Sequence, residues 1–253
     1  MPQSFLKSPL ALLYGAYATV ALALVILPLS LIIIVTPTLA LRRAVGRAGV
    51  KLAMLVIGQP LKVRGLEHLP AGACVCVANH ASYVDGLVLT AALPGRFTFL
   101  VQSRAASWPL IGRTISRMGV SFVNRWSARE AALATRELLK RLQAGESFAI
   151  FAEGTFKPAP GLLAFHSGAF VIATKAQVPV LPAVIRGTRQ LYGEGSWLPR
   201  WSRLEIEILP AIAPDSSSLR GTAGDTRHAA NALRDQVRAA ILAHERARGA
   251  DRA

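Results

Sequence analysis

The chain has 253 residues, 52% of them hydrophobic, and a formal net charge of +15. Its length fits one domain with an appended segment, because domains usually contain roughly 100 to 200 residues, and so apolar a composition excludes a disordered basic tail. The Lys and Arg residues are spread along the chain rather than gathered in a recognition motif, which disfavours nucleic acid as a partner and favours an anionic membrane surface.

The first long run, from Ser8 to Leu41, contains no charged residue and is rich in Leu, Ile, Val and Ala. It is longer than the about 20 residues that one straight membrane crossing needs. Because Pro28 and Pro37 divide it, a kinked or tilted spanning helix and a shallow helical hairpin both fit, and a buried core helix is a third possibility. Basic residues gather after the run: Arg42, Arg43, Arg47, Lys51, Lys62 and Arg64. The excess of basic residues after the run predicts that the protein lies in the cytoplasmic membrane or cell inner membrane, with its C-terminal part on the cytoplasmic side.

Residues 44–58 have a helical pattern in which Arg47 and Lys51 lie four residues apart and share one face. Such a basic, partly apolar helix suits a membrane interface, although a simple connecting helix would look similar. We therefore expect residues 1–58 to form a membrane-associated helical segment. Residues 59–253 are expected to form a folded domain that begins with a strand and turn at 61–70.

From there on, strand-like and helix-like runs alternate. Strands are predicted at 73–78, 97–102, 119–122, 147–152, 178–185 and 204–209, and helices at 87–93, 112–117, 127–143, 168–175 and 226–248. This alternation predicts an α/β fold with a mostly parallel sheet flanked by helices. In the last helix, Leu233, Val237 and Ile241 recur every four residues and should face the core. Cys74 and Cys76 share one face of strand 73–78 and are predicted to be packed thiols, because no residues with zinc-ligand spacing lie nearby; we expect no metal.

The segment NHASYVDG, residues 79–86, joins strand 73–78 to helix 87–93 and places His80 and Asp85 five residues apart. In open α/β sheets, ligands bind beyond the carboxyl ends of the strands, where this segment lies. A carboxylate can hold one imidazole nitrogen protonated and leave the other free to accept a proton, as a general base requires. The spacing alone leaves a structural histidine as the alternative. Ser82 lies between them but lacks the Gly-x-Ser-x-Gly context of a nucleophilic serine.

Three further blocks follow in fixed order: GVSFVNR at 119–125, FAEGT at 151–155 and VPVLPAV at 178–184. With NHASYVDG, these blocks make residues 61–186 similar to the glycerolipid acyltransferase family typified by 1-acylglycerol-3-phosphate acyltransferases. The resemblance implies that His80 is the general base and that Asp85 orients it. It also implies that the acceptor binds near the blocks, at Asn79, Gly119, Phe122, Arg125, Glu153, Gly154 and Thr155.

The resemblance further implies an acyl-CoA or acyl carrier protein donor, a lysophospholipid acceptor, a phospholipid bilayer as partner, no cofactor, and residues 59–253 as the catalytic domain. The expected activity is acylation of lysophosphatidic acid to phosphatidic acid. Two departures bear on the acceptor: Asn124 replaces an aspartate usual in the family, and Phe156 replaces a phosphate-binding arginine, with Lys157 next to it as a possible substitute. Acylation of lyso-ornithine lipid or another lysophospholipid is therefore an alternative, and a non-catalytic membrane lipid-binding protein is a further one.

Overall fold

The computed structural model describes residues 8–123, 128–157, 159, 161–193, 195–216 and 222–250. The helices are α1 (Pro9–Val35), α2 (Leu39–Val56), α3 (Asp85–Ala92), α4 (Ile111–Arg117), α5 (Ala128–Gln143), α6 (Gly168–Ala176), α7 (Thr188–Tyr192) and α8 (Ala223–Ala250). The strands are β1 (Leu61–Arg64), β2 (Val75–Ala78), β3 (Phe97–Gln102), β4 (Ser121–Val123), β5 (Ser147–Phe151), β6 (Val180–Arg186) and β7 (Leu204–Ile208). Two short 3₁₀ helices, η2 (Leu66–His68) and η3 (Ser103–Ser107), complete the set.

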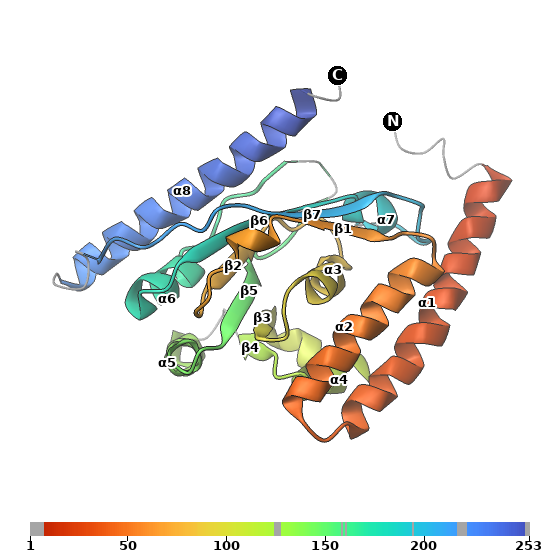
Figure 1. Ribbon diagram of the computed structural model, residues 1–253, viewed down its shortest axis with the longest axis horizontal. Coiled ribbons are helices and arrows are strands. Elements are labelled where there is room, and N and C mark those ends of the chain that lie inside the picture. The colour runs from red at the N-terminus through yellow and green to blue at the C-terminus, as the bar shows by residue number, and fades with distance from the viewer. Residues whose placement is uncertain are drawn as a thin grey trace.

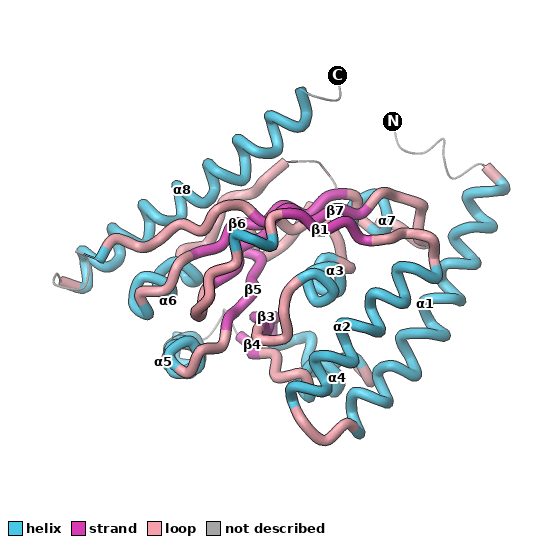
Figure 2. The backbone as a smooth tube through the Cα atoms, in the orientation of Figure 1, coloured by secondary structure: helices cyan, strands magenta, loops and turns pink. Residues whose placement is uncertain are grey.

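The strands form one seven-stranded sheet in the order β1-β7-β6-β2-β5-β3-β4. All neighbours are parallel except β6 and β7, which confirms the predicted mostly parallel α/β fold. Strand β2 lies at the centre and is buried at all four positions, as a parallel strand covered on both faces requires. Figures 1 and 2 show helices on both faces of the sheet.

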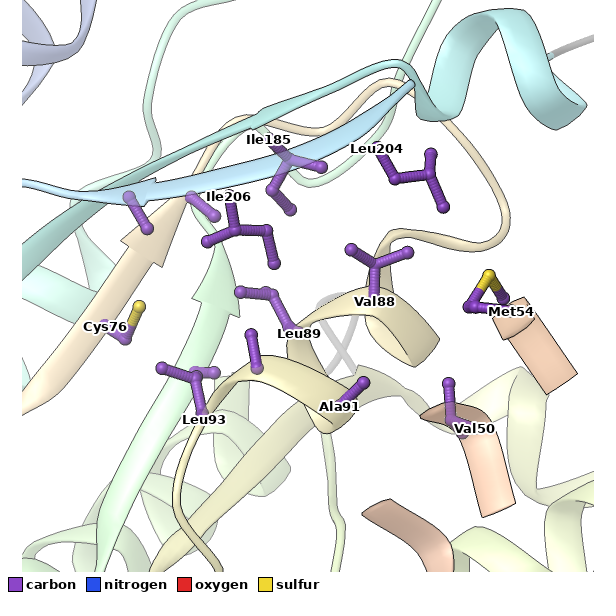
Figure 3. Close-up of a cluster of buried hydrophobic side chains, with 14 of the residues drawn as sticks. Val50, Met54, Cys76, Val88, Leu89, Ala91, Leu93, Ile185, Leu204 and Ile206 are labelled. Carbon is purple, nitrogen blue, oxygen red and sulfur yellow. The ribbon is translucent and has the colours of Figure 1, made fainter. Parts of the chain in front are cut away.

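Each face of the sheet has its own hydrophobic core. On one face, α2 and α3 pack against β2, β6 and β7, and Figure 3 shows Met54, Val88 and Leu89 converging there with Ile185 and Ile206. On the other face, α5, α6 and α8 cover the sheet. The predicted stripe of α8 is buried in this second core: Leu233, Val237 and Ile241.

Strand β7 alternates as predicted, but its polar side is only partly exposed to water. Glu205 and Glu207 are half-buried and ion-paired, Glu205 with Arg64 at 3.2 Å and Glu207 with Arg186 at 3.4 Å. His244 of α8 also lies 2.9 Å from Glu207, because α8 covers this part of the sheet. Both cysteines are free and buried, as the prediction of packed thiols requires.

The N-terminal run forms two helices, α1 and α2, joined at Thr36–Thr38 and packed side by side (Figure 1). Pro28 lies inside α1 and Pro37 lies in the turn, so the apolar run forms one helix as far as Val35, and α2 packs beside it as the second helix of a hairpin. Among the helices described, α1 alone is long and apolar enough to cross a membrane. One side of α1 packs on the domain, and its other side exposes large apolar side chains: Leu10, Leu13, Tyr17, Val20, Leu24, Leu27, Leu31 and Val35.

Candidate active site

The loop 79–84 connects the carboxyl end of β2 to the first turn of α3, and Asn79 fixes its start. The side chain of Asn79 donates to the carbonyl of Ile185 at 3.0 Å and accepts from the Ile185 backbone N–H at 2.7 Å. These two bonds continue the β2–β6 pairing by one residue beyond Ala78. Both polar atoms of the Asn79 side chain are therefore engaged with the backbone, whereas the family resemblance implied acceptor binding there.

His80 and Asp85 form a hydrogen-bonded pair, as their spacing had suggested. Nδ1 of His80 lies 2.8 Å from Oδ2 of Asp85, and the same oxygen accepts from the backbone N–H groups of Ala81 and Ser82 at 2.6 and 2.8 Å. Asp85 is completely buried at the first residue of α3. With its position fixed by three donors, the carboxylate holds the Nδ1 proton and leaves Nε2 of His80 free to accept one.

Two phenylalanines fix the imidazole ring of His80. Phe151, the last residue of β5, stacks on it with centroids 4.2 Å apart, and Phe156 meets it edge-on at 4.6 Å. Phe156 also touches Tyr83 at 4.9 Å, and Tyr83 lies 6.2 Å from Tyr192 of α7. Phe156, Tyr83 and Tyr192 therefore form an aromatic wall beside the dyad. The side chain of Lys157 is exposed, and its carbonyl accepts from Arg189.

Glu153 lies just beyond β5 and is only 3% exposed. Its Oε1 accepts from the backbone N–H of His80, and its Oε2 accepts from that of Leu163, both at 2.7 Å. Burial raises the pKa of the Glu153 carboxyl, outweighing these two N–H groups, which lower it. Both oxygens thus accept from the backbone around the dyad, and these contacts help to position His80.

The remaining third-block residues lie close to the dyad in the turn after β5. Gly154 has a positive φ of 73°, a conformation in which other residues are strained, and its N–H donates to the carbonyl of Phe151 at 3.0 Å. Thr155 follows with an exposed side chain, immediately before Phe156. Within the described ranges, no three His, Cys, Asp or Glu side chains gather as a metal site would require.

The described part of the second block, residues 119–123, begins just before β4 and includes that strand. Gly119 precedes β4 at its amino end, whereas His80 follows the carboxyl end of the parallel β2, so the structure does not bring Gly119 to the dyad. The Gly119 carbonyl accepts from Thr98 and Arg141 at 2.8 and 2.9 Å. Phe122 lies in β4 opposite Val101 of β3. Asn124 and Arg125 lie outside the described residues.

Ser82 is buried, and its hydroxyl both donates and accepts a hydrogen bond. Its hydroxyl donates to the carbonyl of Tyr192 at 2.5 Å and accepts from the Val84 N–H at 3.2 Å, which leaves no role as a nucleophile. Tyr192 belongs to α7, a helix that the sequence pattern did not indicate. The sequence also did not predict the aromatic side chains around the dyad, because only the fold brings Phe151, Phe156 and Tyr192 to one end of the sheet.

Comparisons with known proteins show which family and which fold the chain resembles. A family model described as acyltransferase matches residues 60–186. The chain is 34% identical over 136 residues to a chloroplastic 1-acyl-sn-glycerol-3-phosphate acyltransferase of Brassica napus, covering 53% of this chain and 39% of that protein. It is also 34% identical over 134 residues to the lyso-ornithine lipid O-acyltransferase of Pseudomonas aeruginosa, covering 53% and 51%.

Among solved structures, the crystal structure of the 1-acyl-sn-glycerophosphate acyltransferase from Thermotoga maritima has a similar fold. Its TM-score is 0.66 at 22% sequence identity, and the match covers 90% of this chain and 95% of that one. The fold thus extends over nearly the whole chain. The matches to the two curated relatives, by contrast, span about two fifths and one half of their lengths.

Proposed function

The chain belongs to the acyltransferase family, and we propose that it transfers a fatty acyl group from acyl-CoA or acyl carrier protein to the hydroxyl of lysophosphatidic acid, which forms phosphatidic acid. The observation that carries this proposal is the His80–Asp85 pair, with Nδ1 held at 2.8 Å by a buried carboxylate at the carboxyl end of β2. The name of the Brassica napus relative supports the choice of acceptor. In this proposal, residues 59–253 are the catalytic domain.

The proposed mechanism needs one base and no covalent enzyme intermediate. Nε2 of His80 accepts the proton of the acceptor hydroxyl while the oxygen attacks the thioester carbonyl. The tetrahedral intermediate then collapses to the ester and expels the thiolate, which takes the proton from the imidazolium. Asp85 stabilises the transient positive charge on His80 and holds the ring in one tautomer. A thioester is already activated, so we propose that the reaction uses neither a metal nor a bound cofactor.

The acceptor is the part of the proposal for which the sequence and the structure offer a second candidate. Phe156 stands where relatives carry a phosphate-binding arginine, and its ring packs on His80 and Tyr83 rather than presenting a charge. This observation favours lyso-ornithine lipid or another lysophospholipid as an alternative acceptor, in line with the name of the Pseudomonas aeruginosa relative. Arg125 remains the cation that we propose for a phosphate in the acceptor.

A panel of lyso-lipids tests the two candidates. Purified protein is given one acyl-CoA or one acyl carrier protein thioester, and kcat/KM is measured for lysophosphatidic acid, lyso-ornithine lipid and other lysophospholipids. Turnover of lysophosphatidic acid with the highest kcat/KM supports the first proposal, and turnover of another acceptor alone rejects it. The variant Phe156→Arg should shift the ratio of kcat/KM values toward lysophosphatidic acid, because it adds a guanidinium suited to phosphate oxygens. Absence of any turnover would instead favour the non-catalytic lipid-binding alternative.

We also propose that the α1–α2 hairpin seats the protein on the cytoplasmic leaflet of the cytoplasmic or inner membrane. The hairpin is tied to the domain at both of its ends. At the open end, Nε1 of Trp201 donates to the carbonyl of Gly58 at 3.1 Å, and near the turn Arg117 of α4 donates to the carbonyl of Ile34 at 3.1 Å. A helix held along the domain in this way is suited to lie in the interface with its exposed apolar side toward lipid. The basic residues after α1 are consistent with attraction to anionic headgroups.

A further inference from the structure

Two tryptophans lie on the surface of residues 195–203, the segment between α7 and β7. The Trp197 side chain is 92% exposed and that of Trp201 is 57% exposed. Trp has the largest apolar surface of any side chain and is usually well buried, so two such rings on one short segment need an explanation. Exposed apolar groups that gather in one place commonly mark a binding surface.

This segment is fixed to the helical hairpin. Leu198 and Pro199 pack directly on Gly15 of α1, where an added Cβ would lie 2.8 Å from Leu198 Cβ and 3.1 Å from the Pro199 carbonyl. On the other side, Gln59 donates to the carbonyl of Arg200 at 3.0 Å, and Nε1 of Trp201 donates to that of Gly58 at 3.1 Å. These contacts give the tryptophans a defined place beside the amino-terminal half of α1.

The half of α1 on which this segment packs also exposes apolar side chains. Its amino-terminal half exposes Leu10, Leu12, Leu13, Tyr17 and Val20, and Tyr17 is tied to the end of α2 by a hydrogen bond of 2.5 Å to the Val56 carbonyl. Aliphatic side chains flanked by Trp and Tyr match the composition of a membrane–water boundary, where aromatic rings with one polar atom are enriched. Arg203, which is exposed in the same segment, suits an anionic headgroup.

We propose that residues 195–203 form a membrane contact in addition to the hairpin, in which Trp197 and Trp201 enter the interface of an anionic phospholipid bilayer beside α1. The inference rests on the membrane association proposed above for the hairpin. It adds that the catalytic domain itself touches lipid, through the segment that directly follows α7. Because α7 supplies Tyr192 to the aromatic wall at the dyad, this contact would hold that wall close to the bilayer from which a lipid acceptor arrives.

Fluorescence quenching by brominated lipids tests the contact in the full chain. The variant Trp108→Phe, Trp126→Phe, Trp201→Phe keeps Trp197 as the only tryptophan. It is bound to phosphatidylcholine–phosphatidylglycerol vesicles whose acyl chains are either plain or brominated near the carbonyl. We expect the bromine to lower the Trp197 emission about twofold or more, because an interfacial indole lies within contact of the upper acyl chain.

Two control proteins without native tryptophan make the result decisive. One carries Leu24→Trp on the exposed side of α1, and the other carries Leu133→Trp on the exposed surface of α5, away from the hairpin. Quenching at Trp197 and at position 24, but not at 133, supports the proposal. Quenching at position 24 without quenching at Trp197 rejects the contact of residues 195–203 with lipid but still supports the contact of the hairpin. No quenching at 24, or equal quenching at 133 and Trp197, rejects the membrane orientation on which the inference rests; turnover of detergent-dispersed acceptor reports separately on the acyltransferase proposal.

Discussion

A glutamate lies at each end of strand β5, and the two are held by different partners. Glu146 precedes the amino end and accepts from Arg43 of α2 at 3.1 Å and from Arg141 of α5 at 2.5 Å. Glu153 follows the carboxyl end, and its partners among the described residues are the backbone N–H groups of His80 and Leu163. One end of the sheet therefore fastens the α1–α2 hairpin to the domain, and the other end orients the proposed general base.

The partners give the two carboxyl groups opposite pKa shifts. Burial raises the pKa of both, but at Glu146 the guanidinium groups of Arg141 and Arg43 outweigh burial and leave the pKa lowered. At Glu153 two neutral backbone donors do not outweigh it, and the pKa stays raised. Full charges thus stabilise the carboxylate at the anchoring end, whereas at the end with the dyad the effect of burial on the Glu153 carboxyl is the larger one.

The difference between the two ends of the sheet also explains the role of Gly119 in the second sequence block. Gly119 belongs to the anchoring end: its carbonyl accepts from Arg141, the partner of Glu146, and a Cβ at Gly119 would lie 3.1 Å from Arg43 Nη2. Its φ of 80° also favours glycine. A residue that recurs in an acceptor-binding block is used here to dock a helix. Membership of a block therefore does not by itself place a residue at the reacting atoms.

The largest effect is expected from His80→Ala, which removes the proposed general base at the carboxyl end of β2. We expect kcat to fall by about 10²- to 10⁴-fold, the usual contribution of a positioned general base, while loss of the bond to the buried Asp85 should lower the free energy of unfolding by about 1–3 kcal/mol. Steady-state kinetics and thermal unfolding of the purified variant measure the two quantities. His228→Ala, which removes an exposed histidine of α8, is the matched control and should keep full activity. Unchanged turnover in His80→Ala would contradict the mechanism.

The next effect concerns Glu153. Glu153→Ala leaves the buried N–H groups of His80 and Leu163 without their acceptor, which should lower the free energy of unfolding by about 1–3 kcal/mol. Displacement of the His80 backbone should also lower kcat by up to about 100-fold, since small misplacements of a catalytic group are costly. Glu153→Gln retains one acceptor oxygen and should recover part of both losses. If KM for the acceptor rises while kcat stays constant, Glu153 binds the acceptor instead.

A substitution of Arg43 tests the other end of the sheet, where Glu146 precedes β5. Its buried guanidinium donates to the carbonyls of Met118 and Gly95 as well as to Glu146, so Arg43→Ala should cost about 1.5–3 kcal/mol of unfolding free energy. The kcat of the folded fraction should remain close to that of the parent, because no contact of Arg43 reaches the dyad end of the sheet. Lys51→Ala, at an exposed position of the same helix, should change neither value. A loss of kcat without a loss of stability would show that the two ends are not independent.

The sequence predicted most of this architecture, because its signals are local. The strands predicted at 97–102 and 204–209 correspond to β3 and β7, and the five-residue spacing predicted that His80 and Asp85 could meet. What it could not predict depends on contacts between distant segments. Asn79 pairs with Ile185, 106 residues away, and Phe156 reaches His80 only because β2 and β5 are neighbours in the sheet. The helix α7 was missed because five residues provide too little periodicity to recognise.

The smallest expected effect is a difference in pH dependence between the two glutamates. At Glu146 the folded-state pKa is lowered, so its contribution to stability is present above the unfolded-state pKa and is lost as the pH falls through the folded-state value. At Glu153 the folded-state pKa is raised, so its contribution is present below the unfolded-state pKa and is lost as the pH rises through the folded-state value. Chemical denaturation of the parent, Glu146→Gln and Glu153→Gln across the acidic range measures both. Relative to the parent, Glu146→Gln should lose its disadvantage on acidification, whereas Glu153→Gln should gain one. Parallel curves for the two variants would contradict the assignment of charged partners to one end of β5 and neutral partners to the other.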